Sequence, residues 1–162
     1  MRVAAMETNI EYATASAIAA EELAAFYERQ GHHTTRDLAK LERMIANSFC
    51  FVTARLDGEL IGMARGVTDG VHGYLSECKL DPRFQGPACI TRKDGRIEHD
   101  SEGIAAEMAL RVVSALAEFG VDRIHALAYG TEVDFCEEMG FRRVSGMVVL
   151  ERAVTAPAPV NA

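Results

Sequence analysis

The stretch Tyr74-Leu-Ser-Glu-Cys-Lys-Leu-Asp-Pro-Arg-Phe-Gln-Gly86 decides the fold expected for this chain. We predict a strand over Val71 to Leu80, and Asp81-Pro82 ends it because proline cannot donate a hydrogen bond to a sheet. A loop that begins with glycine follows. Apolar residues then recur at helical spacing from Gly103 to Phe119, which predicts a long and largely buried helix. The stretch therefore joins a strand to a helix through a glycine loop.

The residues before this stretch predict one strand, two helices and a β-hairpin. Asp57-Gly58 indicates the hairpin, because these residue types readily adopt the positive φ angles of a two-residue turn. The strands are expected at Ile10–Thr14, Phe49–Leu56 and Glu59–Arg65, and the helices at Ser16–Gln30 and from a cap at Thr34 or Thr35 to Asn47. This half of the chain is therefore predicted to be mostly antiparallel.

The residues after the long helix predict a strand, a short helix and a last strand. These elements are expected at Arg123–Ala128, Glu132–Met139 and Phe141–Leu150. No linker or internal repeat divides the chain, so we predict a single α/β domain over residues 1–152. Residues 153–162 contain Pro157 and Pro159 among small side chains, and such a composition predicts a flexible tail.

Composition limits the classes of function. The chain has 162 residues, a net charge of −7 and 49% hydrophobic residues, and an acidic surface disfavours nucleic acid as a partner. No apolar run approaches the roughly 20 residues of a membrane span, and the N-terminus lacks a secretory signal, so we expect a cytoplasmic protein with no membrane partner. The cysteines are scattered through apolar segments, which favours reduced thiols over a disulfide framework; they are Cys50, Cys78, Cys89 and Cys136.

The segment from Phe49 to Leu150 resembles the GNAT superfamily of acyl-CoA-dependent N-acyltransferases. Phe49 to Arg65 is similar to the family's second and third strands with an acidic-glycine turn between them. Tyr74 to Gly86 is similar to the fourth strand and the V-x-P-x-[YF]-[QR]-G entry to the cofactor loop, and Phe135-Cys-Glu-Glu-Met-Gly-Phe141 to the closing fYeklGF segment. The resemblance implies a mixed, mostly antiparallel central sheet flanked by helices.

The resemblance also implies a cosubstrate, acetyl-CoA or another short acyl-CoA. In the family, a [QR]-x-x-G-x-[GA] loop and the N-terminus of the next helix hold the pyrophosphate through backbone N–H groups. Gln85-Gly86 matches the start of this loop, and Gly103-Ile104-Ala105 matches its end. Between them, Pro87 to Glu102 form an insert where the family usually has one residue.

The insert leaves two interpretations open. Asp94-Gly95, flanked by alternating residues, predicts an extra β-hairpin. Either this hairpin projects while the two halves of the loop close around the phosphates, or it destroys the phosphate site. Arg92, Lys93 and Arg96 would contact a phosphate or an acidic substrate, or they are solvated charges on a hairpin tip.

Four further residues take roles by resemblance. The backbone of Cys78 and Leu80 would pair with the pantetheine arm like an added strand, and one N–H would polarise the thioester carbonyl. Glu77 would deprotonate the amine, although an exposed strand position explains a glutamate equally well. Cys136 stands where the family often has a tyrosine that protonates the leaving thiolate. A thiol is shorter than a phenol, so Cys136 would be a weak acid or a core residue.

The sequence leaves the acceptor, the oligomeric state and the choice between two functions open. The amine acceptor is a small molecule or a peptide, and no acceptor pattern is evident in the first two helices. A homodimer through the late strands is a further expectation from the resemblance. His72, His99 and His125 show no zinc spacing with the cysteines, so no metal is expected. The rival function is a non-catalytic binding or regulatory domain whose insert blocks coenzyme A, whereas a nicotinamide enzyme is disfavoured because no G-x-G-x-x-G follows a strand.

Overall fold

The computed structural model describes residues 9–14, 18–31, 35–86 and 95–154, and it has an α/β architecture. A five-stranded sheet has the order β1-β2-β3-β4-β5. The strands are β1 (Ile10–Thr14), β2 (Cys50–Leu56), β3 (Glu59–Thr68), β4 (His72–Leu80) and β5 (Arg123–Ala126). β1 to β4 pair antiparallel and β5 pairs parallel with β4, which confirms the predicted mixed sheet.

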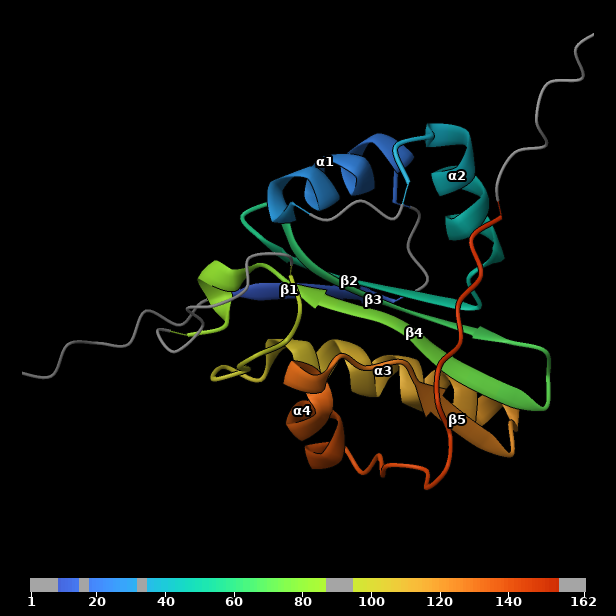
Figure 1. Ribbon diagram of the computed structural model, residues 1–162. Coiled ribbons are helices and arrows are strands. Elements are labelled where there is room, and N and C mark those ends of the chain that lie inside the picture. Colours follow the sequence, from blue (N-terminus) through green and yellow to red (C-terminus); the bar gives the residue numbers. More distant parts are fainter. Residues whose placement is uncertain (1–8, 15–17, 32–34, 87–94, 155–162) are drawn as a thin grey trace, which may run out of the picture.

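Helices cover both faces of this sheet (Figure 1). α1 (Ala20–Gln30) and α2 (Leu38–Asn47) lie on one face, and α3 (Ile104–Phe119) and α4 (Val133–Glu138) lie on the other. Two short 3-10 turns, η1 (Pro82–Phe84) and η2 (Gly130–Glu132), precede the glycine loop and α4 respectively. Asp37 caps α2 by accepting hydrogen bonds from the backbone of Ala39 and Lys40, so the cap is this residue and not the expected Thr35.

Each face of the sheet has its own hydrophobic core. Leu23, Phe26 and Tyr27 of α1 pack against Leu60 and Met63 of β3 on one side. On the other side, α3 supplies the largest share of the core through Ile104, Ala105, Met108, Ala109, Val112 and Leu116. Two glycines of β3 let α3 lie close to the sheet, because a Cβ on Gly66 would stand 2.7 Å from Cγ1 of Val112.

The hairpin prediction at Asp57-Gly58 is confirmed. β2 and β3 are antiparallel neighbours, and the two turn residues have φ angles of 50° and 81°. Such a pair of positive φ angles suits the right-handed twist of the strands that it joins. β3 runs to Thr68, three residues beyond the expected Arg65, because its pairing with β4 extends through Gly73.

β4 and β5 separate along their length. Their parallel pairing joins His72–Leu75 to Arg123–Ala126 and ends there, although β4 continues to Leu80. On the other side, β3 pairs with β4 through Leu80. The second half of β4 therefore has a strand on one edge only among the described residues, and the glycine loop begins at the end of this half.

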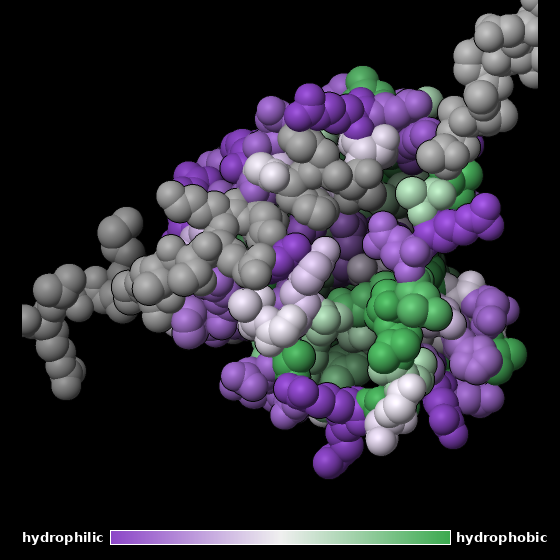
Figure 2. All heavy atoms as spheres, in the orientation of Figure 1, coloured by the Kyte–Doolittle hydropathy of each residue, from purple (hydrophilic) through white to green (hydrophobic). Residues whose placement is uncertain are grey.

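The expected last strand at Phe141–Leu150 is wrong. Residues 141–154 contain no strand. Phe141 is half-buried against the α3-side core, whereas the apolar side chains from Val144 to Val154 are exposed, with Val148 at 77% and Leu150 at 89%. The segment after α4 is a coil (Figure 1), and apolar side chains gather on that part of the surface (Figure 2). The alternation of the sequence shows that the segment suits a strand, but a strand also needs a paired edge, and no pairing with the free edge of β5 is formed. The predicted tail from residue 155 lies outside the described residues.

Replacing Gly66 with alanine tests the close approach of α3 to β3. The added Cβ would meet Val112 at 2.7 Å and the carbonyl oxygen of Tyr74 at 3.3 Å, so the helix or the strand must shift. We expect Gly66→Ala to lower the free energy of unfolding by about 1–3 kcal/mol, measured by urea denaturation. Gly130→Ala is the matched control, because its Cβ meets nothing within 4 Å; an equal loss in both variants would contradict the close approach.

Candidate functional site

The outer edge of β4 carries the first part of the candidate site. The N–H of Asp81 donates to Ile61 of β3, so the backbone groups of Leu80 and Cys78 point away from β3, toward the gap where β5 has left. This edge is not empty. The Leu80 N–H donates to the carbonyl oxygen of Gly95 at 3.0 Å, and the insert therefore runs along the strand end.

Gln85 fixes the insert in this place. Its side chain is fully buried, and its Nε2 donates to the carbonyl oxygens of Leu80 at 2.7 Å and Arg96 at 2.8 Å. Its Oε1 accepts from the N–H groups of Glu98 at 2.9 Å and His99 at 3.4 Å. A primary amide has two donor hydrogens and two acceptor lone pairs, so these bonds use its full capacity.

The N-terminus of α3 carries the second part. Its backbone N–H groups at Ala105 and Ala106 donate to the two carboxylate oxygens of Asp100, each at 2.9 Å. Gly103 and Gly86 shape the two ends of the loop with φ angles of 73° and 105°. A helix N-terminus attracts an anion, and in this chain the anion is a carboxylate of the insert.

The insert also reaches the core and α4. Ile97 is fully buried in the α3-side core, and its N–H donates to Oε2 of Glu132 at 3.1 Å. The guanidinium carbon of Arg96 lies 3.2 Å from the ring centroid of Tyr129, so Arg96 is a packed residue in this structure. The described half of the insert, residues 95–102, has no strand and does not project. Residues 87–94, with most of the expected hairpin, lie outside the described residues.

Glu77 lies on the opposite face of the sheet, against α1. Its side chain is 13% exposed, and its Oε2 accepts hydrogen bonds from the Tyr27 hydroxyl and from Nε of Arg65, both at 2.8 Å. The alternative of an exposed strand position is therefore wrong.

Cys78 and Cys136 both pack against the α3-side core. Burial raises the pKa of the Cys136 thiol to about 11, and the Glu132 carboxylate adds to the rise. Burial also raises the pKa of Cys78 well above its usual range, with contributions from Glu132 and Asp100, and its Sγ lies 3.7 Å from the carbonyl oxygen of Ala105. Both thiols are protonated at neutral pH. The two predicted catalytic residues, Glu77 and Cys136, thus contact different faces of the sheet.

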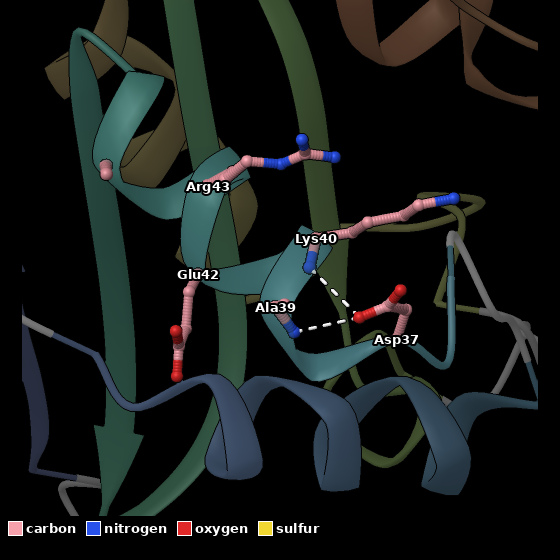
Figure 3. A pocket seen from close by; sticks show the side chains of 6 residues that line it. Asp37, Ala39, Lys40, Glu42 and Arg43 are labelled. Carbon is pink, nitrogen blue, oxygen red and sulfur yellow. Dashed lines mark hydrogen bonds between the residues drawn. The ribbon is translucent and has the colours of Figure 1, made fainter.

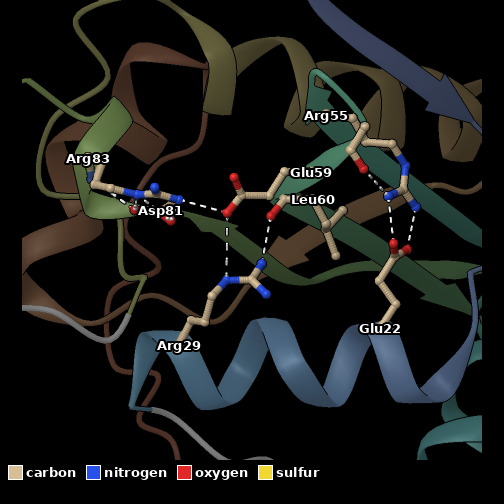
Figure 4. A network of polar contacts seen from close by, with 8 residues as sticks. Glu22, Arg29, Arg55, Glu59, Leu60, Asp81 and Arg83 are labelled. Carbon is tan, nitrogen blue, oxygen red and sulfur yellow. Dashed lines mark hydrogen bonds and ion pairs between the residues drawn. The ribbon is translucent and has the colours of Figure 1, made fainter.

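An ionic network holds the start of the glycine loop (Figure 4). Arg83 bonds the Asp81 carboxylate at 2.8 Å and Glu59 at 2.9 Å, and Arg29 of α1 lies near the same Glu59. Asp81 in turn accepts from the N–H of Arg83 and so caps η1. The network joins α1, the β2–β3 hairpin and η1, and it sets where the chain leaves β4.

Two shallow hollows lie elsewhere. One is lined by Asp37 and residues of α2, namely Ala39, Lys40, Glu42, Arg43 and Ala46 (Figure 3). The Asp37 carboxylate in it is already used by the helix cap. The other is lined by Glu137, Gly140, Phe141, Arg142 and Arg143. Neither gathers buried polar groups from several elements, so neither competes with the end of β4 as a site.

The described residues contain no metal centre or membrane span. Within the described ranges, no group of three or more His, Cys, Asp or Glu side chains is placed to hold a metal ion. No helix in those ranges has the length and apolar character that a bilayer span needs. Cys50, Cys78 and Cys136 are free thiols.

The fold was compared with solved structures. A GNAT-family acetyltransferase from Streptococcus pneumoniae is 18% identical with a TM-score of 0.63, over 89% of this chain and 99% of that one. The chain has the GNAT fold. A predicted acetyltransferase with acetyl-CoA from Clostridium acetobutylicum is 17% identical with a TM-score of 0.64, over 88% of this chain and 96% of that one. No protein-family model and no curated protein sequence matches this chain.

A third structure adds a small-molecule acetyltransferase to the comparison. The aminoglycoside N-acetyltransferase AAC(6')-Iy in complex with CoA is 14% identical with a TM-score of 0.64, over 90% of this chain and 95% of that one. At these identities the similarity is one of fold. The residues expected to bind the cosubstrate lie around one end of β4; they are Cys78, Leu80, Gln85, Gly86, Gly103, Ile104 and Ala105.

Sequence reasoning missed the residues that occupy this end of the fold. Asp100 and Ile97 lie in the insert, and Tyr27 and Arg65 hold Glu77 from two other elements. No local signal marks Asp100, because the N-cap position of α3 is Gly103 and Asp100 lies three residues before it. Nothing local marks Tyr27 as a partner of Glu77, because the two are fifty residues apart.

Gln85→Glu tests the role of the buried amide. A carboxylate cannot donate to the carbonyl oxygens of Leu80 and Arg96, and its charge is buried. We expect the free energy of unfolding at pH 7 to fall by at least about 2 kcal/mol in urea denaturation. Asn47→Asp makes the same chemical change at an exposed amide with one hydrogen bond, to Arg43, and should cost less than about 1 kcal/mol. Equal losses of unfolding free energy in the two variants would contradict the role of Gln85 in holding the insert.

The raised pKa values of Cys78 and Cys136 predict slow alkylation by iodoacetamide. Only the thiolate reacts, so labelling of the folded protein should stay slow until the pH approaches about 11 for Cys136 and should become fast on denaturation. Because the folded pKa of Cys136 is higher than its unfolded pKa, the contribution of this thiol to stability is complete below the unfolded pKa and is lost as pH rises toward about 11. A Cys89→Ser background keeps Cys89 out of the readout. Rapid labelling of folded protein at pH 8 would contradict the prediction.

Proposed function

We propose that the protein is an N-acyltransferase that moves an acetyl or other short acyl group from acyl-CoA to an amine. The observation that carries the proposal is the end of β4 at Leu80, where β5 no longer pairs with it. There the edge of β4, freed where β5 departs, leads through a glycine loop to the N-terminus of α3. A strand edge can pair with the amides of a pantetheine arm, and the helix N-terminus can hold a pyrophosphate.

The residues between β4 and the N-terminus of α3 have different roles in this reaction. The backbone of Cys78 and Leu80 pairs with the pantetheine arm and polarises the thioester carbonyl. Gly86, Gly103, Ile104 and Ala105 let the backbone approach the phosphates, and Gln85 shapes the loop from beneath. The amine attacks the carbonyl carbon directly, the C–S bond breaks, and no acyl-enzyme forms.

One side chain accepts a proton in this reaction and another donates one. Glu77 takes the proton of the attacking amine, directly or through water, and Arg65 and Tyr27 position its carboxylate. The Cys136 thiol, protonated at neutral pH, donates to the leaving thiolate of coenzyme A. The acceptor is a small-molecule or peptide amine. AAC(6')-Iy, whose fold this chain shares, acts on aminoglycosides, which supports the small-molecule class.

A second candidate function rests on a specific observation. The Leu80 N–H and the α3 N–H groups already have partners in Gly95 and Asp100. A domain whose cofactor site is permanently filled by its own insert would be a non-catalytic binding or regulatory module.

A homodimer is part of the proposal. Among the described residues, β5 has no strand on its outer side, and Met147 to Leu150 expose apolar side chains. Two copies related by a twofold axis would cover both.

Acetyl-CoA binding tests the proposed function. We expect a rise in melting temperature that grows with ligand concentration, since binding stabilises the folded state by about 2.7 kcal/mol at a hundredfold excess over Kd. Release of coenzyme A thiol should follow when a panel of amines is added. Glu77→Gln should lower kcat strongly, whereas Cys136→Ala should lower it by less than about a thousandfold, or about 4 kcal/mol of barrier. Absence of a thermal shift at millimolar acetyl-CoA would favour the non-catalytic module.

A further inference from the structure

We propose that residues 95–100 are an internal stand-in for coenzyme A, so that the cosubstrate binds only by displacing them. The inference rests on the proposed function and adds a regulatory contact to the same site. Two groups of residues 95–100 occupy the site. The carbonyl oxygen of Gly95 bonds the outer edge of β4, and the carboxylate of Asp100 bonds the N-terminus of α3.

The stand-in offers the chemical groups of the cosubstrate in the same order. A pantetheine arm presents amide groups to a strand edge and ends in a pyrophosphate. Residues 95–100 present a peptide carbonyl to Leu80, then an apolar side chain at Ile97, then an anion to α3. Both occupants would use the same backbone N–H groups, so they cannot bind together.

Charge makes the exclusion stronger at the helix end. The N–H groups of Ala105 and Ala106 each bond one oxygen of Asp100 at 2.9 Å. A pyrophosphate that accepted hydrogen bonds from these N–H groups would contact the Asp100 carboxylate, and two anions in contact repel one another. Asp100 must therefore leave the helix before a phosphate can bind.

Gln85 connects the two ends of the stand-in. Its amide bonds Leu80 of β4 and also the backbone of Arg96, Glu98 and His99. Displacing the segment breaks three of these bonds and leaves Gln85 beside the freed strand end. Gln85 thus holds three backbone groups of the segment, in addition to the contacts made by Gly95, Ile97 and Asp100.

The burial of Ile97 sets the strength of the contact. This side chain is fully buried in the α3-side core, and its N–H bonds Glu132 at the base of α4. Departure of the segment therefore also removes one hydrogen bond from the carboxylate of Glu132, which lies close enough to Cys136 to raise the pKa of its thiol. Entry of coenzyme A would be coupled to the surroundings of Cys136.

The test uses Asp100→Ala with Glu102→Ala as the control of equal charge change. Glu102 is exposed and, within the described part of the chain, does not bond α3. We expect isothermal titration to show coenzyme A binding at least tenfold more tightly to Asp100→Ala than to wild type, with little change for Glu102→Ala. The melting temperature of Asp100→Ala should fall by a few degrees because α3 loses its cap. Asp100→Asn is the milder second variant.

The outcomes separate the inference from the proposed function. Equal affinities in all forms, or an equal gain in Glu102→Ala, would overturn the stand-in while leaving coenzyme A binding established. Binding that appears only in the Asp100 variants would support the stand-in and favour the non-catalytic module for the natural chain. No binding in any form would overturn both.

Hydrogen exchange on the wild-type protein gives a readout that needs no variant. Saturating coenzyme A should speed the exchange of the Glu98 and His99 amides, which bond Gln85 in the free protein. The α3 amides should stay protected, because the phosphate replaces the carboxylate. Unchanged protection of Glu98 and His99 in a complex that binds coenzyme A would contradict displacement.

Discussion

A strand that loses its neighbour inside a protein leaves backbone donors and acceptors that must find other partners. β4 meets this constraint beyond Leu75, where β5 turns away while β4 continues to Leu80. An unpaired buried N–H or C=O costs about as much as a lost hydrogen bond, so the edge has to be covered. The rest of the site follows from which group covers it: a bound cosubstrate, or the chain itself.

In this chain, the insert solves the problem internally. The carbonyl oxygen of Gly95 accepts from the Leu80 N–H, and the side chain of Gln85 donates to the Leu80 carbonyl oxygen. The carboxylate of Asp100 accepts from the backbone of the first turn of α3. The same constraint explains why Gln85 is fully buried although glutamine usually prefers the surface. A polar side chain is tolerated in a core when every one of its hydrogen-bonding groups is used, and the amide of Gln85 meets that condition.

Much of the fold could be predicted from local patterns. Asp57-Gly58 predicted the hairpin, Asp81-Pro82 predicted the end of β4, and the apolar spacing after Gly103 predicted α3, because each depends on a few neighbouring residues. The occupied site could not be predicted. The alternating residues around Asp94-Gly95 predicted a hairpin, and a local pattern cannot show that Ile97 has a place in a core formed by distant elements.

The failure at Phe141–Leu150 has the same origin. The sequence there suits a strand, yet strand formation depends on an edge elsewhere in the fold. Among the described residues, the second half of β4 and the outer side of β5 each lack a neighbouring strand. The edge of β4 is covered by a segment with a glycine, a buried isoleucine and an aspartate that bonds α3, whereas no described segment pairs with β5 and the apolar side chains of Met147 to Leu150 are exposed.

The covered edge of β4 links the stability of the fold to its activity. Every contact that holds residues 95–100 on β4 stabilises the free protein, and in the displacement scheme the same contacts oppose coenzyme A. Substitutions at Asp100 should therefore change stability and cosubstrate affinity in opposite directions, a trade-off that a preformed empty site would not have. For an ordinary cofactor loop, loss of a capping residue weakens the fold and the binding together, so the sign of this correlation distinguishes an occupied site from a merely distorted one.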